Sequence, residues 1–380
     1  MIKIDISKVE KLFDIGSRFG TKINLARKKF IISFVLAMCL SRSVQFNKIA
    51  TFLNEEATDA SNIRRIQRFF KDYELSYLQF AILMISFLPN KKYRLCIDRT
   101  NWKFGSTDIN IFALTVHYKG TSIPILFEML DKKGNSNQQE RIDLLDKFVS
   151  IFGHKRIKSL TADREFIGEK WFKFLIQKKI CFHIRIPKSH FVQVGNLDIK
   201  GEEALNKYGK RFLKNVTYQN MNLHLAMDFS KNKKGEDDPL LVITNNENCD
   251  ALKIYKERWS IEVFFQSIKN RGFNMEETHL TEMEKIAKLF MFTGIAFAVC
   301  LTIGIYKDAV ENKIPIKNHG YKANSYFRHG LDALKEVLAR PNKMKNRLNE
   351  FIDLVVGFIQ SVFENITRKF VKIRLKKIVV

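Results

Sequence analysis

The periodicity of apolar residues changes at about residue 93, and this change constrains the fold more than any other feature of the sequence. From there, short runs of β-branched and apolar residues, which are typical of strands, alternate with two longer stretches of helical periodicity. We expect strands at 93–98, 109–118, 122–130, 156–163 and 179–186, and helices at 138–152 and 165–177. The order strand, strand, strand, helix, strand, helix, strand predicts a mixed α/β domain.

That order matches the ribonuclease H-like fold, in which acidic residues at the ends of the first and fourth strands lie side by side. In this sequence Asp98 ends the first expected strand and Asp163 ends the fourth. A single aspartate at a strand end is usually only a turn or capping residue. The fold nevertheless predicts that these two aspartates are neighbours.

A third acidic residue lies in the stretch 255–269, which has the pattern of one amphipathic helix without glycine or proline. At about 100° per residue its polar groups share a narrow stripe, and its apolar groups fill the adjoining arc. The stripe consists of Tyr255, Arg258, Glu262 and Lys269, and the apolar arc of Ile261, Phe264, Phe265 and Ile268. We expect the helix to bury the apolar arc and to hold the stripe at the rim of a core. Charges at this spacing also occur on ordinary solvated helix faces, so the pattern alone leaves both interpretations open.

Three acids at the expected places of one fold form a set of hard oxygen donors. Such donors suit Mg²⁺ or Mn²⁺. Cleavage of a phosphodiester requires stabilisation of the attacking and the leaving oxygen, and two metal ions about 4 Å apart supply it when carboxylates bracket them. We therefore expect Asp98, Asp163 and Glu262 to bind metal.

The spacing of the polar stripe resembles a family signature. Tyrosine, two residues, arginine, three residues, glutamate, six residues and lysine form the signature of the IS-four family of bacterial insertion-sequence transposases, and all four positions match. The segments RWSIEVFF around Glu262, IDRTNW around Asp98 and TADREF around Asp163 are similar to that family as well. On these motifs the chain is identified as resembling a DDE transposase of the IS-four type over about 93–269.

The resemblance implies that the two aspartates and Glu262 are the catalytic triad, holding Mg²⁺ with Mn²⁺ as a substitute. It also implies that Tyr255, Arg258 and Lys269 hold DNA phosphate near the transposon end, with Trp259 close to the same DNA. The reaction would be metal-dependent strand cleavage followed by strand transfer into target DNA. A hairpin intermediate on the transposon end and a homodimer in the synaptic complex are further implications.

The segment between the second aspartate and the glutamate is longer than one strand and a linker require. In the family that this chain resembles, the excess is a strand-rich insertion, and 222–229 and 240–246 have the pattern of its strands. We expect five segments: a helical DNA-binding domain at 1–88, the catalytic core at 89–186, the β-rich insertion at 187–250, the catalytic helix at 251–280 and a helical region at 281–380.

The first 88 residues have helical patterns, and 46–70 resembles a helix-turn-helix. Its second helix would begin near Asp59 or Ser61 and turn polar residues outward. Such a helix can lie in the major groove of double-stranded DNA, with its arginines on phosphates. An ordinary solvated basic helix explains the same pattern, and both interpretations stay open. The residues expected on DNA are Asn62, Arg64, Arg65 and Arg68.

The formal charge of +25, from 65 Lys and Arg against 40 Asp and Glu, indicates a polyanionic partner, with nucleic acid as the first candidate and an anionic membrane surface as the second. Five scattered cysteines without a CxxC pair argue against a zinc site or disulfides and fit a reducing cytoplasm. The uncharged run 289–306 is long enough to span a membrane, but its threonines and glycines favour a buried helix. We expect a bacterial, nucleoid-associated protein and no membrane partner.

The function predicted from the sequence is cut-and-paste transposition of DNA with terminal inverted repeats. Two other functions stay open. One is a ribonuclease H-fold nuclease without strand transfer, against which the long insertion and the large helical region argue. The other is a non-catalytic DNA-binding relic of an insertion sequence, which the intact triad disfavours.

Overall fold

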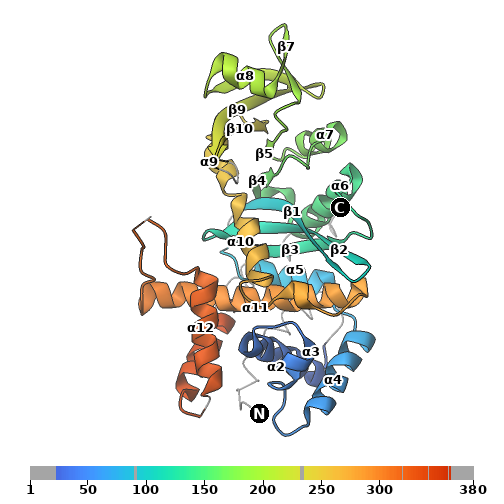
Figure 1. Cartoon of the computed structure of the whole chain (residues 1–380), viewed down its shortest axis with the longest axis vertical. Coiled ribbons are helices and arrows are strands. Elements are labelled where there is room, and N and C mark those ends of the chain that lie inside the picture. The colour runs from blue at the N-terminus through green and yellow to red at the C-terminus, as the bar shows by residue number, and fades with distance from the viewer. Residues whose placement is uncertain are drawn as a thin grey trace, which may run out of the picture. The chain divides into compact units, whose positions relative to one another are not determined.

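The computed structural model describes residues 23–89, 92–231, 235–318, 320–340, 342–357 and 359–360. The chain forms two compact units, each assembled from segments that are distant in the sequence (Figure 1). The sheet unit comprises Lys91–Asn101 and Asn110–Phe264. The helical unit comprises Met1–Asn90, Trp102–Ile109 and Phe265–Val380.

One ten-stranded sheet, in the order β3-β2-β1-β4-β5-β10-β9-β8-β6-β7, organises the sheet unit. Strands β2 and β3 pair antiparallel, whereas β1 with β4 and β4 with β5 pair parallel. The five strands that the sequence predicted therefore occur in the predicted order along the chain, and the first lies beside the fourth as expected. Their bounds are β1 Tyr93–Phe104, β2 Thr107–Tyr118, β3 Thr121–Met129, β4 Ile157–Ala162 and β5 Phe182–Arg185.

Two helices make the crossovers that the parallel pairs require. Helix α6 (Gln138–Phe152) connects β3 to β4, and α7 (Glu169–Gln177) connects β4 to β5. The bounds of α6 agree with those predicted, because its ends carry strong local signals. Asn137 and Glu140 form a reciprocal capping box, and Gly153, at a φ of 84°, ends the helix.

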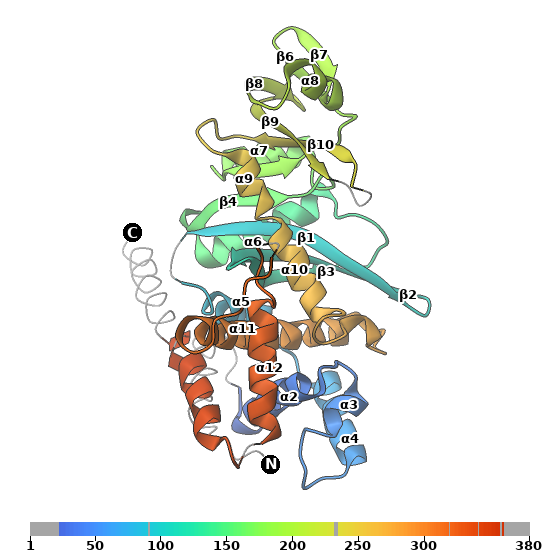
Figure 2. The ribbon, with the colours of Figure 1, turned by 60° about the vertical axis from the view of Figure 1, so that its left-hand side comes forward.

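The second half of the sheet continues from β5 through an antiparallel pair with β10. The strands expected at 222–229 and 240–246 occur as β9 (Met221–Lys231) and β10 (Asp237–Thr244). The segment is not made of strands alone, because helix α8 (Gly201–Tyr208) lies within it (Figure 2). The remaining strands are β6 (Phe191–Val194), β7 (Leu197–Lys200) and β8 (Phe212–Tyr218).

Two predicted boundaries in the sheet unit are wrong. Strand β1 does not end at Asp98 but continues to Phe104, because it forms a long hairpin with β2 around Gly105, whose φ is 58°. Helix α7 begins at Glu169 and not at Glu165, because 163–168 forms a turn.

The single helix predicted at 255–269 is two helices, α9 (Ala251–Lys256) and α10 (Trp259–Ile268). Tight i to i+3 backbone bonds join them, from Arg258 N to Tyr255 O at 2.9 Å and from Ser260 N to Glu257 O at 3.0 Å. Tertiary contacts hold this turn: the Glu257 carboxylate accepts from Arg94, and the Ser260 hydroxyl lies 2.6 Å from that of Ser122.

The helical unit is built around α11 (Met283–Val310), which packs against α12 (Tyr326–Ala339), α2 (Leu25–Ser41) and α5 (Tyr77–Ile85). By length and composition α11 is the one helix of the described chain that could cross a membrane, yet 72% of its most apolar window is buried inside the protein. Within this unit α11 is a core helix, as the sequence favoured.

The expected helix-turn-helix occurs as α3 (Phe46–Ala50) and α4 (Asp59–Asp72). The hydroxyl of Thr58 caps α4, one residue before the predicted capping candidates. The helix expected at 328–376 is interrupted, since α12 ends at Ala339 and helical backbone resumes only at 345–357. Its predicted end at 376 lies outside the described residues.

Candidate active site

The register of strands β1 and β4 places two aspartates next to each other. In the parallel pair of β1 and β4, Ile97 lies opposite Ala162, and Asp98 and Asp163 are the next residues along each chain. Asp98 lies within β1, whereas Asp163 directly follows β4. The predicted neighbourhood of Asp98 and Asp163 is therefore confirmed by the register of the strands.

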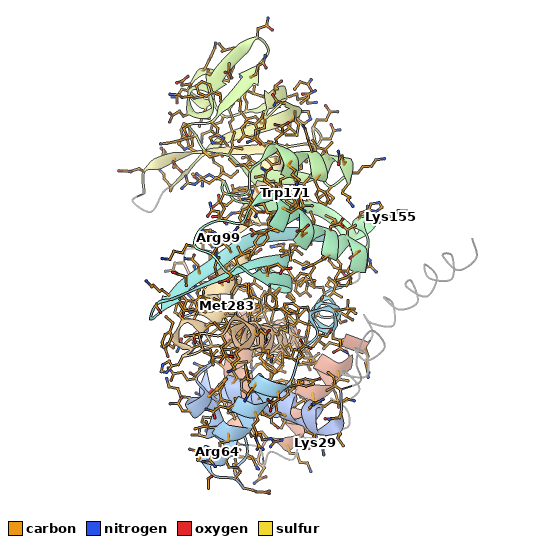
Figure 3. The ribbon with its side chains drawn as sticks, turned by 90° about the vertical axis from the view of Figure 1, so that its right-hand side faces the viewer. Lys29, Arg64, Arg99, Lys155, Trp171 and Met283 are labelled. Atoms are coloured by element: carbon orange, nitrogen blue, oxygen red, sulfur yellow. The ribbon has the colours of Figure 1, made fainter. Side chains whose placement is uncertain are left out.

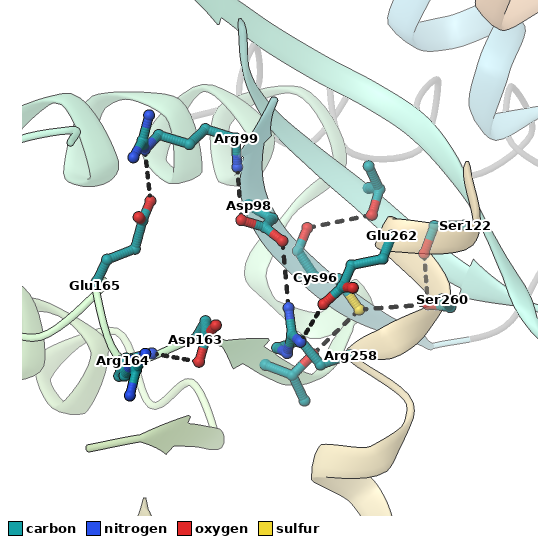
Figure 4. Close-up of polar contacts among 12 residues, drawn as sticks. Cys96, Asp98, Arg99, Ser122, Asp163, Arg164, Glu165, Arg258, Ser260 and Glu262 are labelled. Atoms are coloured by element: carbon teal, nitrogen blue, oxygen red, sulfur yellow. Dashed lines mark hydrogen bonds and ion pairs between the residues drawn. The ribbon is translucent and has the colours of Figure 1, made fainter. Parts of the chain in front are cut away.

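The first turn of α10 brings Glu262 to the same place (Figure 4). The start of α10 is fixed to β1 and β3 by small polar groups in its turn. The hydroxyl of Ser260 contacts Ser122 on β3, and the Cys96 thiol on β1 lies 3.8 Å from the Ser260 hydroxyl. These buried contacts explain why the glutamate faces the two aspartates.

Arg258 lies between the carboxylates of Asp98 and Glu262. Its Nη1 donates to Oδ2 of Asp98 at 3.3 Å, and its Nη2 donates to Oε1 of Glu262 (Figure 4). Its side chain is only 10% exposed. Next to it the phenol of Tyr255 donates to Oδ1 of Asp163 at 3.3 Å. All three predicted acids thus converge on one buried guanidinium and one phenol.

The electrostatics of the cluster follow from its burial. Burial raises the pKa of Asp98 to about 7, despite the opposing effect of Arg258. Burial would lower the pKa of Arg258, but the phenol and the three carboxylates around it raise that pKa above its ordinary value. Burial also raises the pKa of Tyr255, so that its hydroxyl remains a donor at neutral pH.

A second layer of polar contacts holds the turn that follows β4. Arg99 Nε donates to the Glu165 carboxylate at 2.9 Å, and Arg99 Nη2 donates to Asn135 Oδ1 at 2.7 Å. Arg141 Nη2 donates to the main-chain oxygen of Glu165 at 2.9 Å. These residues were not predicted from the sequence, although Arg99 and Glu165 lie within the motifs IDRTNW and TADREF beside the two aspartates. The contacts keep Asp163 at its position opposite β1.

The donor set of the cluster fits a hard divalent cation. Carboxylate oxygens are the ligands that Mg²⁺ prefers, and the raised pKa of Asp98 shows that this carboxyl is poorly compensated by the groups around it. In the described part of the chain, however, no three acidic, histidine or cysteine side chains have the spacing of a ready metal site. Asp98, Asp163 and Glu262 are the residues that could hold a metal here.

The other residues predicted to bind DNA around this cluster differ in exposure. Trp259 is 56% exposed, as a DNA contact requires. Tyr255 and Arg258 are not at the rim that we expected but are buried, at 6% and 8%, because the break before α10 turns them toward the acids. Lys269 follows α10 in the helical unit, where its Nζ lies 2.7 Å from Glu276 and 5.3 Å from the ring centre of Trp102.

The predicted DNA-contacting face of α4 needs one correction. Arg64, Arg65 and Arg68 are exposed, and Figure 3 shows Arg64 on this helix. The prediction that Asn62 faces outward is wrong: it is 2% exposed. Its amide donates to the main-chain oxygens of Ala50 at 3.0 Å and Asn54 at 2.9 Å. Asn62 therefore fixes the turn between α3 and α4 and is not available to DNA.

A mixed α/β core that gathers three carboxylates, one on a strand and one directly after the adjacent parallel strand, is typical of metal-dependent phosphoryl-transfer enzymes. Within that class the chain belongs to the transposase DDE domain family, whose model matches residues 89–301. Membership implies an enzyme that cuts and joins DNA with divalent metal ions.

Comparison with solved structures finds a piggyBac transposase synaptic complex with hairpin DNA. The identity is 12%, the match covers 93% of this chain and 82% of that chain, and the TM-score is 0.46. No curated protein sequence matches the chain.

Proposed function

We propose that this protein is the DDE transposase of a bacterial insertion sequence of the IS-four type and catalyses cut-and-paste transposition. The observation that carries the proposal is the convergence of Asp98, Asp163 and Glu262 around Arg258. Membership of the transposase DDE domain family supports it. The strand order β3-β2-β1-β4-β5 supports a ribonuclease H-like core, with the later strands as its insertion.

The three carboxylates would hold two Mg²⁺ ions, for which Mn²⁺ substitutes. When bound, the metal supplies charge stabilisation for the attacking and the leaving oxygen of the scissile phosphodiester. Arg258 holds Asp98 and Glu262 in one orientation through its two donating nitrogens. Tyr255 orients Asp163 in the same way through its hydroxyl. These residues preorganise the carboxylates so that little rearrangement is needed during the reaction.

The DNA partners in this proposal are duplexes with terminal inverted repeats and, after cleavage, target DNA. Exposed Trp259 would contact the transposon end near Glu262, and Lys269 would contact its phosphates. Arg258 and Tyr255 are buried among the acids and would act on the DNA only through them. The helical DNA-binding domain at 1–88 would bind the repeat, and two copies would form the synaptic complex. The protein would act at the nucleoid in the bacterial cytoplasm. The charge of +25 supports a polyanionic partner.

The decisive experiment supplies the purified protein with Mg²⁺ and a DNA fragment bounded by the inverted repeats that flank its gene. Paired cleavage at both ends with joining to a target plasmid is the expected result. Cutting without joining would indicate a nuclease of the same fold. Binding without cutting would indicate a DNA-binding relic, and either outcome would overturn the proposal.

A further inference from the structure

A groove of about 1020 Å³ runs along α4 in the helical unit. We call it the α4 groove. Basic and polar side chains line it together with apolar ones, and no acidic residue of the described chain lines it. The lining residues are Phe46, Thr58, Ala60, Ser61, Arg64, Gln67, Arg68, Phe70, Lys71, His279, Leu280 and Lys285.

One wall of the α4 groove is a row of cations. Arg64, Arg68 and Lys71 are exposed and follow each other at helical spacing along one side of α4. They cover about 10 Å of helix axis, the length of about three phosphate steps along one strand of duplex DNA. None of the three has an ion-pair partner within the described residues, so their charge is directed at solvent.

The opposite wall comes from a distant part of the sequence, the segment 279–285. The ring of His279 stacks on Phe104, with ring centres 5.3 Å apart. Just before it, the main-chain oxygen of Glu277 accepts from Gln45 Nε2 at 3.3 Å, which fixes this wall to the start of α3. Lys285 adds a cation that is 23% exposed and lies against Glu282, the residue just before α11.

The two walls are held together at one end by a buried contact. Lys288 of α11 donates from Nζ to the main-chain oxygen of Phe70 at 2.7 Å, at the carboxyl end of α4. A cation at that end also interacts favourably with the helix dipole. The α4 groove is therefore a built feature of this unit.

We propose that the α4 groove binds one phosphodiester strand of duplex DNA, and that its contacts are made to phosphates without reading base edges. A walled groove in which Arg64, Arg68 and Lys71 lack ion-pair partners among the described residues matches a polyanionic backbone, whereas base readout requires a helix that can enter the major groove. Arg65 lies outside the α4 groove, with its guanidinium 5.5 Å from the ring centre of Phe30. The assignment rests on the proposed function, since it presumes DNA as the partner.

The test compares groove lysines with an exposed lysine elsewhere in the same unit. Lys71→Gln and Lys285→Gln each remove one cation from the α4 groove, and Lys335→Gln on α12 removes one outside it. Binding to two unrelated fluorescein-labelled 24-base-pair duplexes would be followed by anisotropy between about 50 and 300 mM KCl. Each groove variant should lower the slope of log affinity against log salt by about 0.9, equally on both duplexes, and the control should not. Lys285→Arg should restore the wild-type slope.

Two results would overturn the inference. One is a groove variant that keeps the wild-type slope, and the other is a loss confined to one of the two duplexes, which would mean base readout. Thermal melts of each variant verify that folding is unchanged. If the wild-type protein itself binds neither duplex with a salt-dependent affinity, the proposed transposase function fails as well. If the wild type binds both duplexes and the groove variants keep its salt dependence, the α4 groove is excluded as a DNA site while the proposed transposase function stands.

Discussion

The carboxylate cluster of the sheet unit and the α4 groove of the helical unit use cations in opposite ways. In the cluster, Arg258 is buried and bonded to Asp98 and Glu262. In the α4 groove, Arg64 and Arg68 are exposed and line an open surface. A buried cation stabilises the acids around it, because an unpaired charge in the interior is costly. An exposed cation costs little to maintain and is available to a polyanion. In the proposed function, the buried cation positions the acids and the exposed cations bind DNA.

The largest effect should come from the acids themselves. Replacing Asp163 or Glu262 with Ala should lower cleavage of transposon-end DNA by about a thousandfold, because each change removes a proposed metal ligand. Affinity for the same DNA should change by less than about twofold, since no base contact is lost. Cleavage gels and anisotropy on the same variants measure both quantities. Cleavage at a tenth of the wild-type rate in a variant would remove that residue from the site.

Loss of an arginine should destabilise the protein in the carboxylate cluster but not in the α4 groove. Arg258→Met leaves two carboxylates without their partner, and the free energy of unfolding should fall by about 3–5 kcal/mol. The matched change Arg68→Met, in the α4 groove, should alter it by less than about 0.5 kcal/mol. Urea unfolding at pH 8 measures both variants. Equal losses would mean that Arg258 does not stabilise the cluster.

The pKa of Asp98 should make this cluster sensitive to pH. Because the pKa is about 7 in the folded protein and ordinary in the unfolded chain, the folded state alone keeps the proton between about pH 4 and 7. Stability should therefore fall as pH rises through this window, by about 2–4 kcal/mol.

Asp98→Asn should lack this contribution. The difference in unfolding free energy between wild type and variant, measured in urea at pH 5 and pH 8, isolates it. A difference that stays constant, or that moves in favour of the wild type at pH 8, would contradict the assignment. Added Mg²⁺ should raise the melting temperature of the wild type at pH 8 more than that of Asp98→Asn, since the cation would compensate the charged carboxyl.

The smallest effect is expected at Asn62 of α4, which is buried and does not face DNA. Asn62→Ala leaves the main-chain oxygens of Ala50 and Asn54 without their donor, and unfolding free energy should fall by about 1–3 kcal/mol. Its exposed neighbour Arg64→Ala should instead weaken duplex binding with little change in stability. Thermal melts and anisotropy on both variants test this reciprocal pattern. If Asn62→Ala kept full stability, the structural role of Asn62 would be wrong.

The sequence by itself determined the order of the core elements along the chain and the neighbourhood of the two aspartates. The helix α6 carries its own capping box at Asn137 and Glu140, so its start required no distant contact. The neighbourhood of Asp98 and Asp163 follows from the strand order, because adjacent parallel strands in register place successive residues side by side.

Tertiary structure alone decided where Arg258 and Asn62 point. Helical periodicity assigned one continuous face to 255–269, but contacts of Glu257 and Ser260 with other strands turn the chain and direct Arg258 toward the acids. Likewise, the periodicity of this basic helix predicts that Asn62 faces solvent. Asn62 is buried instead because its amide donates to main-chain oxygens in the preceding turn. The wall of the α4 groove at 279–285 comes from a segment far along the chain, and periodicity within α4 carries no signal of it.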